Sequence, residues 1–182
     1  MSTPEPEIFE RFRQCVLRKD WRGVGDLLAE DAEALAASIA AHGAEPADAT
    51  SDEAKDEAKK ALVRRYFDMW NTGAGVVADA VLAGTYIDHA YPDVVGPAAA
   101  RSLAPRFHAA NPDAKMVIEA MVAEGELVTV RNALHRTREG KEVVSRGIAL
   151  FRVAGDKLVE QWSFYPGKRP HARFSHGAPQ AR

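Results

Sequence analysis

The sequence contains a single cysteine, Cys15, among its 182 residues. One cysteine excludes an intrachain disulfide and a metal cluster built on several cysteines. Cys15 lies in an apolar pattern with helical spacing, where a small core residue is expected rather than a nucleophile. No HxH or HxxxH spacing presets a metal site either. We therefore expect no metal and no cofactor.

The sequence also lacks an excess of positive charge and long apolar runs. The formal net charge is −2, which gives no general excess of basic residues for binding nucleic acid. No stretch approaches the roughly 18 apolar residues of a membrane-spanning helix. Residues 1–7 lack the basic and apolar regions of a secretory signal. We expect a cytoplasmic protein with neither nucleic acid nor membrane as a partner.

The composition that remains is that of an ordinary globular protein, with 46% hydrophobic and 27% charged residues. Its distribution predicts three parts. Residues 1–52 are expected to form an N-terminal helical extension and an acidic linker. Residues 53–166 are expected to form one pocket domain, and residues 167–182 a basic, flexible tail.

Within the pocket domain, helical periodicity comes first and strand periodicity follows. Helical patterns cover residues 52–73, 76–82 and 98–107, and a short β-prone run covers residues 85–89. Four strands separated by glycine turns are predicted at residues 116–124, 127–137, 142–153 and 157–165. This order predicts an α+β fold, a curved antiparallel sheet with helices across it. Such a fold leaves a ligand cavity at its open end.

Three segments carry a resemblance to a known family: LVRRYFDMWNTGAGVVADAVLAGTYIDHAYPDVVG, ANPDAKMVIEAMVAEGELVTVR and RGIALFRVAGDKLVEQW. They resemble the SnoaL-like polyketide cyclases of the ketosteroid isomerase and nuclear transport factor 2-like superfamily. The resemblance implies a cone-shaped fold that is usually dimeric through its sheet. It does not name the activity, because this fold carries isomerases, cyclases, dehydratases, epoxide hydrolases and non-catalytic binders.

The resemblance implies three catalytic candidates, Tyr66, His89 and Asp88. Tyr66 matches the tyrosine that donates a hydrogen bond to the substrate oxygen, which requires a dry interior. His89 matches the base, and an Asp-His pair is frequent here in SnoaL-like sequences. Adjacent strand residues face opposite ways. We expect His89, which can move a proton near neutral pH, to face the pocket, with Asp88 supporting it or the turn. A core tyrosine and a surface Asp-His pair are the alternatives.

The remaining candidates would either line the pocket or replace an acid that the family has and this sequence lacks. Ala149 stands where the cyclases and ketosteroid isomerases carry a functional aspartate, and alanine cannot transfer a proton. Asn132 interrupts an apolar strand face, so it either bonds to a neighbour or orients a ligand. The possible substitutes for the acid are His108, His135, Glu119 and Arg131. The substrate-binding candidates are Trp70, Phe107, His108, Met121, Asn132, Ala149, Phe151 and Trp162.

These features indicate a biosynthetic cyclase or isomerase-type enzyme. Its substrate would be a largely apolar, carbonyl-containing, polyketide-like small molecule, of the kind handled in antibiotic biosynthesis. Ring closures that need mainly a shaped pocket fit the missing acid better than aldol chemistry. We expect a homodimer. The alternative is a non-catalytic domain of the same fold that binds a small molecule or serves association.

Overall fold

The computed structural model describes residues 51–91 and 94–165, together with residues 10–12, 14, 15, 18, 20, 23, 26 and 27. The predicted linker and basic tail lie outside the described residues, apart from the first positions of the domain helix. The boundaries 1–52, 53–166 and 167–182 therefore stay predictions.

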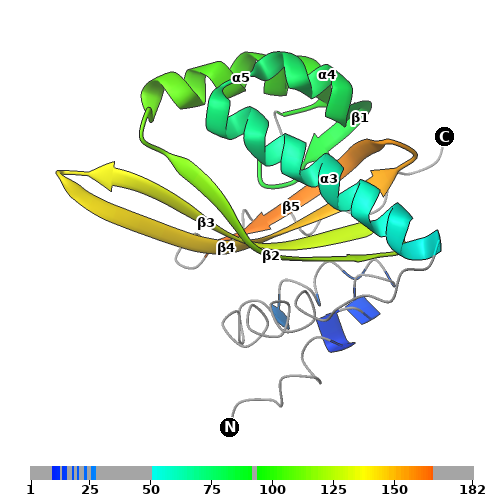
Figure 1. Cartoon of the computed structure of the whole chain (residues 1–182). Coiled ribbons are helices and arrows are strands. Elements are labelled where there is room, and N and C mark those ends of the chain that lie inside the picture. Colours follow the sequence, from blue (N-terminus) through cyan, green and yellow to red (C-terminus); the bar gives the residue numbers. More distant parts are fainter. Residues whose placement is uncertain are drawn as a thin grey trace, which may run out of the picture.

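The described elements follow the predicted order of helices and then strands. They are α3 (Ser51–Thr72), the 3-10 helix η1 (Gly75–Val77), α4 (Ala78–Val81), β1 (Leu82–Asp88), α5 (Gly96–Ala110), β2 (Lys115–Glu124), β3 (Leu127–Arg138), β4 (Lys141–Ala154) and β5 (Lys157–Phe164). The strands form one five-stranded sheet in the order β1-β5-β4-β3-β2. Figure 1 shows the helices above one face of this sheet. The predicted α+β cone is confirmed.

The sheet is antiparallel from β2 to β5, as the glycine turns predict, and β1 adds a parallel strand beside β5. That strand begins at Leu82, where the sequence predicts the end of a helix. Leu82 pairs with Leu158 and is almost completely buried. The pairing with β5 therefore overrides the helical appearance of the local sequence.

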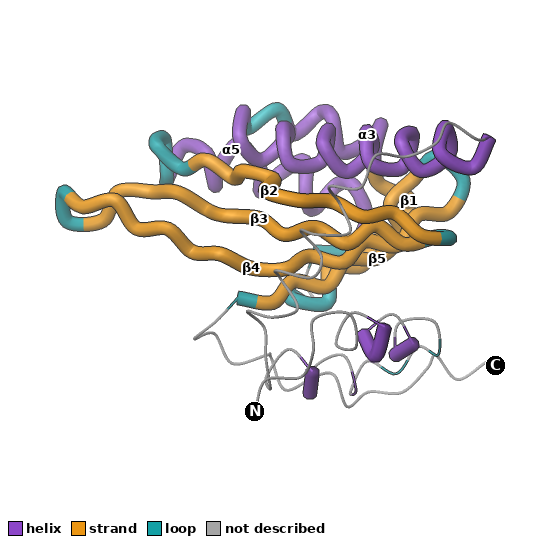
Figure 2. The backbone as a smooth tube through the Cα atoms, turned by 60° about the horizontal axis from the view of Figure 1, so that its bottom comes forward, coloured by secondary structure: helices purple, strands orange, loops and turns teal. Residues whose placement is uncertain are grey.

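The helices bury one face of the sheet, which we call the inner face. Val63, Phe67 and Met69 of α3 pack in one core cluster with Val128 of β3 and Phe151 of β4. Figure 2 shows α3 and α5 running across the same side of the curved sheet. Because successive strand residues face opposite ways, this cluster identifies the inner-face residues of each strand, with a change of alternation at the bulges in the sheet.

The opposite face of the sheet, the outer face, carries buried side chains as well. Leu150 and Trp162 pair across β4 and β5 and are each no more than 2% exposed within the single chain. Figures 1 and 2 both place the described N-terminal residues on this side of the sheet. Several of these residues are helical, and Phe12 and Leu27 are buried. N-terminal helical structure outside the cone is thus present, and the homodimer stays a prediction.

None of the described helices is long and apolar enough to cross a membrane.

Candidate functional site

A group of polar side chains lies in the interior between the helices and the inner face of the sheet. Tyr66 comes from α3, Tyr86 from β1 and Gln161 from β5. The Tyr86 hydroxyl lies 2.7 Å from Gln161 Oε1 and 3.4 Å from the Tyr66 hydroxyl. Gln161 Nε2 in turn donates to Ser163 Oγ at 2.8 Å. These bonds join three elements into one interior network.

The network leaves the Tyr66 proton available. Each phenol carries a single proton, and the 2.7 Å contact with the Gln161 amide oxygen takes that of Tyr86. The contact between the two hydroxyls is long for an O–H···O bond. Tyr66 can therefore donate its proton to a ligand oxygen while Tyr86 stays bound to Gln161.

Both phenols remain neutral at physiological pH. Burial raises the pKa of Tyr66 well above its ordinary value, and the nearby Asp88 carboxyl raises it further. Hydrogen bonds with the side chains of Tyr86 and Trp70 oppose this shift. Burial also raises the pKa of Tyr86. A neutral phenol in a dry interior is a hydrogen-bond donor for a developing oxyanion.

Asp88 is the ionisable carboxyl of this interior. It is 4% exposed, and it pairs with Gln161 across β1 and β5. Burial raises its pKa from 3.8 to about 6, although the backbone N–H groups of Ala90 and Tyr91 lower it by donating to Oδ1, at 2.9 and 3.2 Å. A carboxyl with a pKa near neutrality can both take and return a proton.

His89 lies on the other side of the sheet. Its ring stacks on Trp162 with a centroid distance of 4.5 Å and an interplanar angle of 4°. Its Nε2 atom is 3.7 Å from Glu160 Oε2. The expected orientation is therefore reversed, because Asp88 rather than His89 enters the interior. Trp162 likewise lies on the outer face and is not a wall of the interior.

The outer-face residue Glu160 is held in its charged form. The nearby His89 ring, and then the guanidinium of Arg152, lower the pKa of Glu160 from 4.5 to about 2 against the opposing effect of partial burial. Arg152 Nη2 donates to Glu160 Oε1 at 2.6 Å. The cluster of His89, Trp162, Glu160 and Arg152 thus joins β1, β5 and β4 on the outer face.

Asn132 lies on the inner face of β3, as the sequence predicts. It is 0% exposed, and its Oδ1 atom accepts a hydrogen bond from the Tyr165 hydroxyl at 3.0 Å. Its Nδ2 atom is buried with no hydrogen-bond partner among the described residues. Burial raises the pKa of Tyr165 to about 12, and the charges of Tyr91 and Asp88 contribute. Tyr165, two positions after Ser163, therefore connects Asn132 of β3 to the end of β5.

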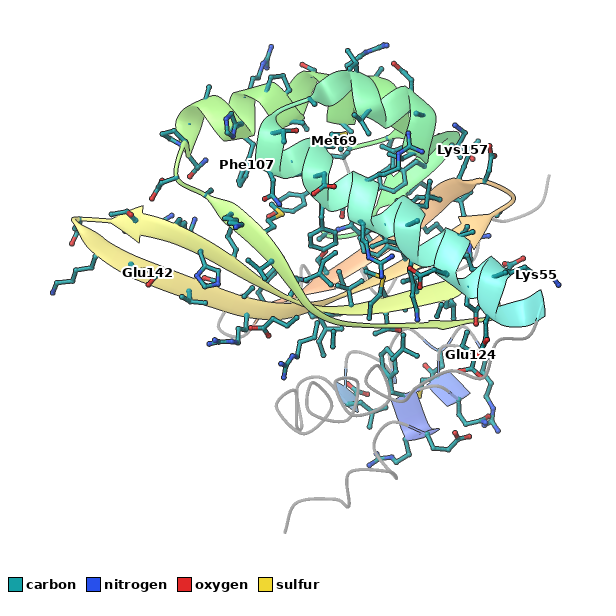
Figure 3. The ribbon with its side chains drawn as sticks, viewed as in Figure 1. Lys55, Met69, Phe107, Glu124, Glu142 and Lys157 are labelled. Carbon is teal, nitrogen blue, oxygen red and sulfur yellow. The ribbon has the colours of Figure 1, made fainter. Side chains whose placement is uncertain are left out.

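Partly exposed apolar side chains lie at one end of this interior. Trp70 of α3 and Phe107 of α5 meet edge to face at 5.8 Å. Met116 and Ile118 of β2 are partly buried against the same core. Asn71 fixes α3 to β2 by two hydrogen bonds with the backbone of Met116. Figure 3 shows Phe107 where α5 leads into β2, with Lys55 and Glu124 at the opposite end.

The other predicted walls divide between core and periphery. Met121, Ala149 and Phe151 are buried on the inner face in the core cluster. Phe151 lies 5.2 Å from Tyr66, edge to face, so these two are brought together. His108 lies at the end of α5 against Gly73, because a β-carbon built there would lie 3.0 Å from His108 Cβ.

The other proposed substitutes for the acid do not join the interior group. Glu119 forms ion pairs with Arg131 and Arg146 at 3.1 Å, and Arg131 faces outward opposite Ile148. His135 lies 2.9 Å from Glu142 at the surface. Among the described residues, no group of three His, Cys, Asp or Glu side chains is placed to hold a metal ion.

Four interior residues were missed by sequence reasoning: Tyr86, Gln161, Ser163 and Tyr165. Two of them carried a signal. Tyr86 stands two residues before Asp88 and therefore shares its face. Gln161 directly precedes Trp162, so a strand that buries the indole on one face turns the Gln161 amide to the other. Ser163 and Tyr165 carried none that was specific.

This chain is similar to one protein family and to several solved structures. A family model described as a SnoaL-like domain matches residues 63–161. A solved structure from Jannaschia sp. CCS1, named as a SnoaL-like polyketide cyclase, is 21% identical with a TM-score of 0.55, over 66% of this chain and 92% of that chain. One from Bacillus cereus ATCC 10987, named as a polyketide cyclase, is 22% identical with a TM-score of 0.52, over 58% and 72%.

A SnoaL-like polyketide cyclase from Agrobacterium tumefaciens C58 is 16% identical with a TM-score of 0.51, and the match covers 58% of this chain and 89% of that chain. None of the curated proteins matches this chain. At such identities the structural matches show a shared fold, and the chemistry has to come from the residues of the interior.

Proposed function

The chain belongs to the SnoaL-like domain family, and from this premise we propose that it is a cyclase or isomerase-type enzyme of small-molecule biosynthesis. Its substrate is a largely apolar molecule that carries a carbonyl group, as a polyketide does. The observation that carries this proposal is the shared interior of Tyr66 and Asp88, one a neutral donor and the other a carboxyl with a pKa of about 6.

The proposed reaction begins with proton transfer to Asp88. The Asp88 carboxylate takes a proton from the carbon next to the substrate carbonyl, and the electron pair of the C–H bond moves towards the carbonyl oxygen. Tyr66 donates its hydrogen bond to that oxygen and stabilises the enolate. Where a C=C bond adjoins the acidic carbon, the intermediate is a dienolate, and Asp88 returns the proton to its far carbon, which completes an isomerisation. If the enolate carbon attacks a second carbonyl instead, a C–C bond forms and the resulting alkoxide takes the proton from Asp88, which completes ring closure.

Two further features suit this chemistry. General base catalysis is most effective when the pKa of the base lies near the working pH, and burial places Asp88 there. The apolar residues Trp70, Phe107 and Met116 would receive the carbon skeleton of the substrate. His89 has no part in this scheme, because its ring lies on the outer face against Trp162.

One observation favours a non-catalytic domain that binds a small molecule. Ala149 is buried between inner-face neighbours and supplies no acid where the resemblance expects one. Under this second candidate function, Tyr66 and Asn132 would hold ligand oxygens and no bond would change. The two functions differ in whether protons of a bound ketone exchange with solvent.

Exchange of α-protons tests the proposal without knowledge of the natural substrate. The probe is 2-tetralone, an apolar ketone with acidic α-protons, in D₂O, and loss of its α-proton signal is followed by NMR. We expect the protein to accelerate exchange and Asp88→Asn to abolish the acceleration. His89→Asn is the matched control and should keep it. Binding of 2-tetralone without accelerated exchange would favour the non-catalytic function.

A further inference from the structure

The buried amide of Asn132 requires a hydrogen-bond acceptor that the described part of the chain does not supply. The side chain is 0% exposed, and Nδ2 has no hydrogen-bond partner within residues 51–91 and 94–165 or the other described positions. An unpaired buried amide destabilises the folded protein, so such groups normally have a hydrogen-bond partner. A bound molecule that presents an oxygen to Nδ2 would remove this cost.

The hydrogen bond with Tyr165 determines which end of the Asn132 amide is left without a partner. Its hydroxyl lies 3.0 Å from Asn132 Oδ1, and burial keeps the phenol protonated with a pKa of about 12. In the structure the Tyr165 hydroxyl donates to Oδ1, and Nδ2 is the group left without a partner among the described residues. The free group is therefore a donor, and its partner is an acceptor.

The position of Tyr165 is built into the sheet. Asn132 pairs with Gly147 across β3 and β4. A β-carbon at Gly147 would lie 2.5 Å from the Tyr165 ring and 2.5 Å from the Phe164 carbonyl oxygen. Only the absence of a side chain at Gly147 admits the ring beside Asn132. The orientation of the amide thus depends on Asn132, Gly147 and Tyr165, which lie side by side.

The same tyrosine links Asn132 to the proposed reaction centre. Tyr165 follows Ser163 by two positions, and Ser163 Oγ accepts a hydrogen bond from Gln161, which also binds the Tyr86 hydroxyl. Asn132, whose Oδ1 accepts from Tyr165, therefore lies beyond the Ser163 end of this network. The inner-face residues between Asn132 and β5 are small, since Gly147 precedes Ala149 by two positions and Ala149 pairs with Ser163.

We infer that the ligand of this domain carries two oxygens on one apolar skeleton. The first lies at Tyr66 and Asp88, and the second is a carbonyl or ether oxygen that accepts a hydrogen bond from Asn132 Nδ2. This inference rests on the proposed function and narrows its substrate class to polyoxygenated apolar molecules. Asn132 is a specificity-determining residue, because a ligand without the second oxygen leaves its amide unpaired.

A matched pair of probes tests the second oxygen. The phenol 6-acetyl-2-naphthol presents a carbonyl oxygen, and 6-isopropenyl-2-naphthol replaces that oxygen by a CH₂ group of similar shape. The corresponding 7-substituted pair covers a different spacing between the two oxygens. Dissociation constants are measured by fluorescence titration at pH 8. In the wild-type protein we expect the acetyl compound of at least one pair to bind about tenfold more tightly than its isopropenyl partner.

Variants identify the group responsible. Asn132→Leu removes the amide, and Asn132→Asp keeps the acceptor for Tyr165 but removes the donor. Both should abolish the preference for the acetyl compound. Tyr66→Phe should weaken both members of a pair alike and leave their ratio unchanged. Circular dichroism confirms that each variant is folded.

Each outcome has a defined meaning. Equal binding of both members of both pairs overturns the inference and leaves the proposed function intact. A tenfold preference that persists in Asn132→Asp also overturns it, because the donor would then not be Nδ2. Failure of every naphthol to bind overturns the proposed apolar pocket, and the inference with it.

Discussion

Asp88 and His89 are neighbours in the chain whose side chains lie on opposite faces of the sheet. The Asp88 carboxyl is buried towards Tyr66 and Tyr86, whereas the His89 ring stacks on Trp162. The backbone of His89 donates to the Gln161 carbonyl at 2.8 Å and so continues the pairing of β1 with β5. The proposed reaction depends on this arrangement, because only one of the two ionisable groups can reach the substrate.

The raised pKa of Asp88 predicts a decline of stability with rising pH. A buried acid with a pKa of about 6 when folded and 3.8 when unfolded binds its proton more tightly in the folded state. The free energy of unfolding should therefore fall between about pH 4 and pH 6 and level off above, by up to roughly 3 kcal/mol. In Asp88→Asn this fall should disappear, and the variant should be more stable than the wild type at pH 8.

Urea denaturation at several pH values checks this prediction. The amide oxygen that Asp88→Asn introduces can still accept the two backbone N–H bonds, so the turn is preserved. Asp68→Asn, at an exposed position of α3, is the control and should follow the wild-type curve. An unchanged pH dependence in Asp88→Asn would contradict a buried, shifted carboxyl.

Removing the Tyr66 hydroxyl should affect catalysis far more than folding. Loss of one oxyanion donor typically lowers the rate by about 10²- to 10³-fold, and we expect Tyr66→Phe to slow 2-tetralone exchange to that extent. Its stability should change by no more than about 1 kcal/mol, because the contact with Tyr86 is long. Tyr91→Phe, at an exposed tyrosine, should retain the wild-type rate. Equal rates in the two variants would exclude Tyr66 as the donor.

A side chain at Gly147 should displace Tyr165 from Asn132. The added β-carbon of Gly147→Ala meets the Tyr165 ring and the Phe164 carbonyl oxygen, so we expect a loss of about 1–3 kcal/mol of stability. The side-chain amide resonances of Asn132 should shift in the same variant. Gly84→Ala is the control, because a β-carbon there meets no atom within 4 Å. Unshifted Asn132 resonances in Gly147→Ala would show that Tyr165 does not depend on this glycine.

The outer-face cluster should stabilise the protein at neutral pH and lose its effect in acid. The pKa of Glu160 is lowered from 4.5 to about 2 by His89 and Arg152. Its contribution is present above about pH 4.5 and is lost as the pH falls towards 2. Glu160→Gln should therefore lower the melting temperature at pH 7. The difference in melting temperature between this variant and the wild type should become smaller in acid. Glu142→Gln, at an exposed glutamate, should change it less, and the reverse order would refute this role for Glu160.

Local signals predicted most of the fold. Gly125 has a φ of 57° between β2 and β3, a conformation that glycine adopts without strain, and the sequence predicts a turn there. The strand boundaries followed from such turns and from the alternation of apolar residues. The start of β1 was missed, because Leu82 becomes a strand residue only through its partner Leu158. Because Leu82 and Leu158 are far apart in the sequence, their pairing leaves no signal in the residues around Leu82.

The site was harder to predict because it depends on which residues of β1 point to the inner face of the sheet. Ile87 precedes His89 by two positions and Tyr86 precedes Asp88 by two, so each of the two ionisable residues shares its face of β1 with a large apolar or aromatic residue. Alternation alone could not choose between them. The choice is made by the pairing of Asp88 with Gln161, after an irregularity between Leu82 and Ile87. Tyr66 and Asn132 were placed correctly, because each lies in an element with a clear apolar face.

The pH profile of 2-tetralone exchange tests the role of Asp88 most directly. We predict that the wild-type rate rises as the pH passes through about 6, where Asp88 loses its proton, and is level above. His89→Asn should show the same profile, and Asp88→Asn should show no acceleration at any pH. Acceleration retained in Asp88→Asn, or lost in His89→Asn, would contradict the assignment of Asp88 as the residue that moves the proton.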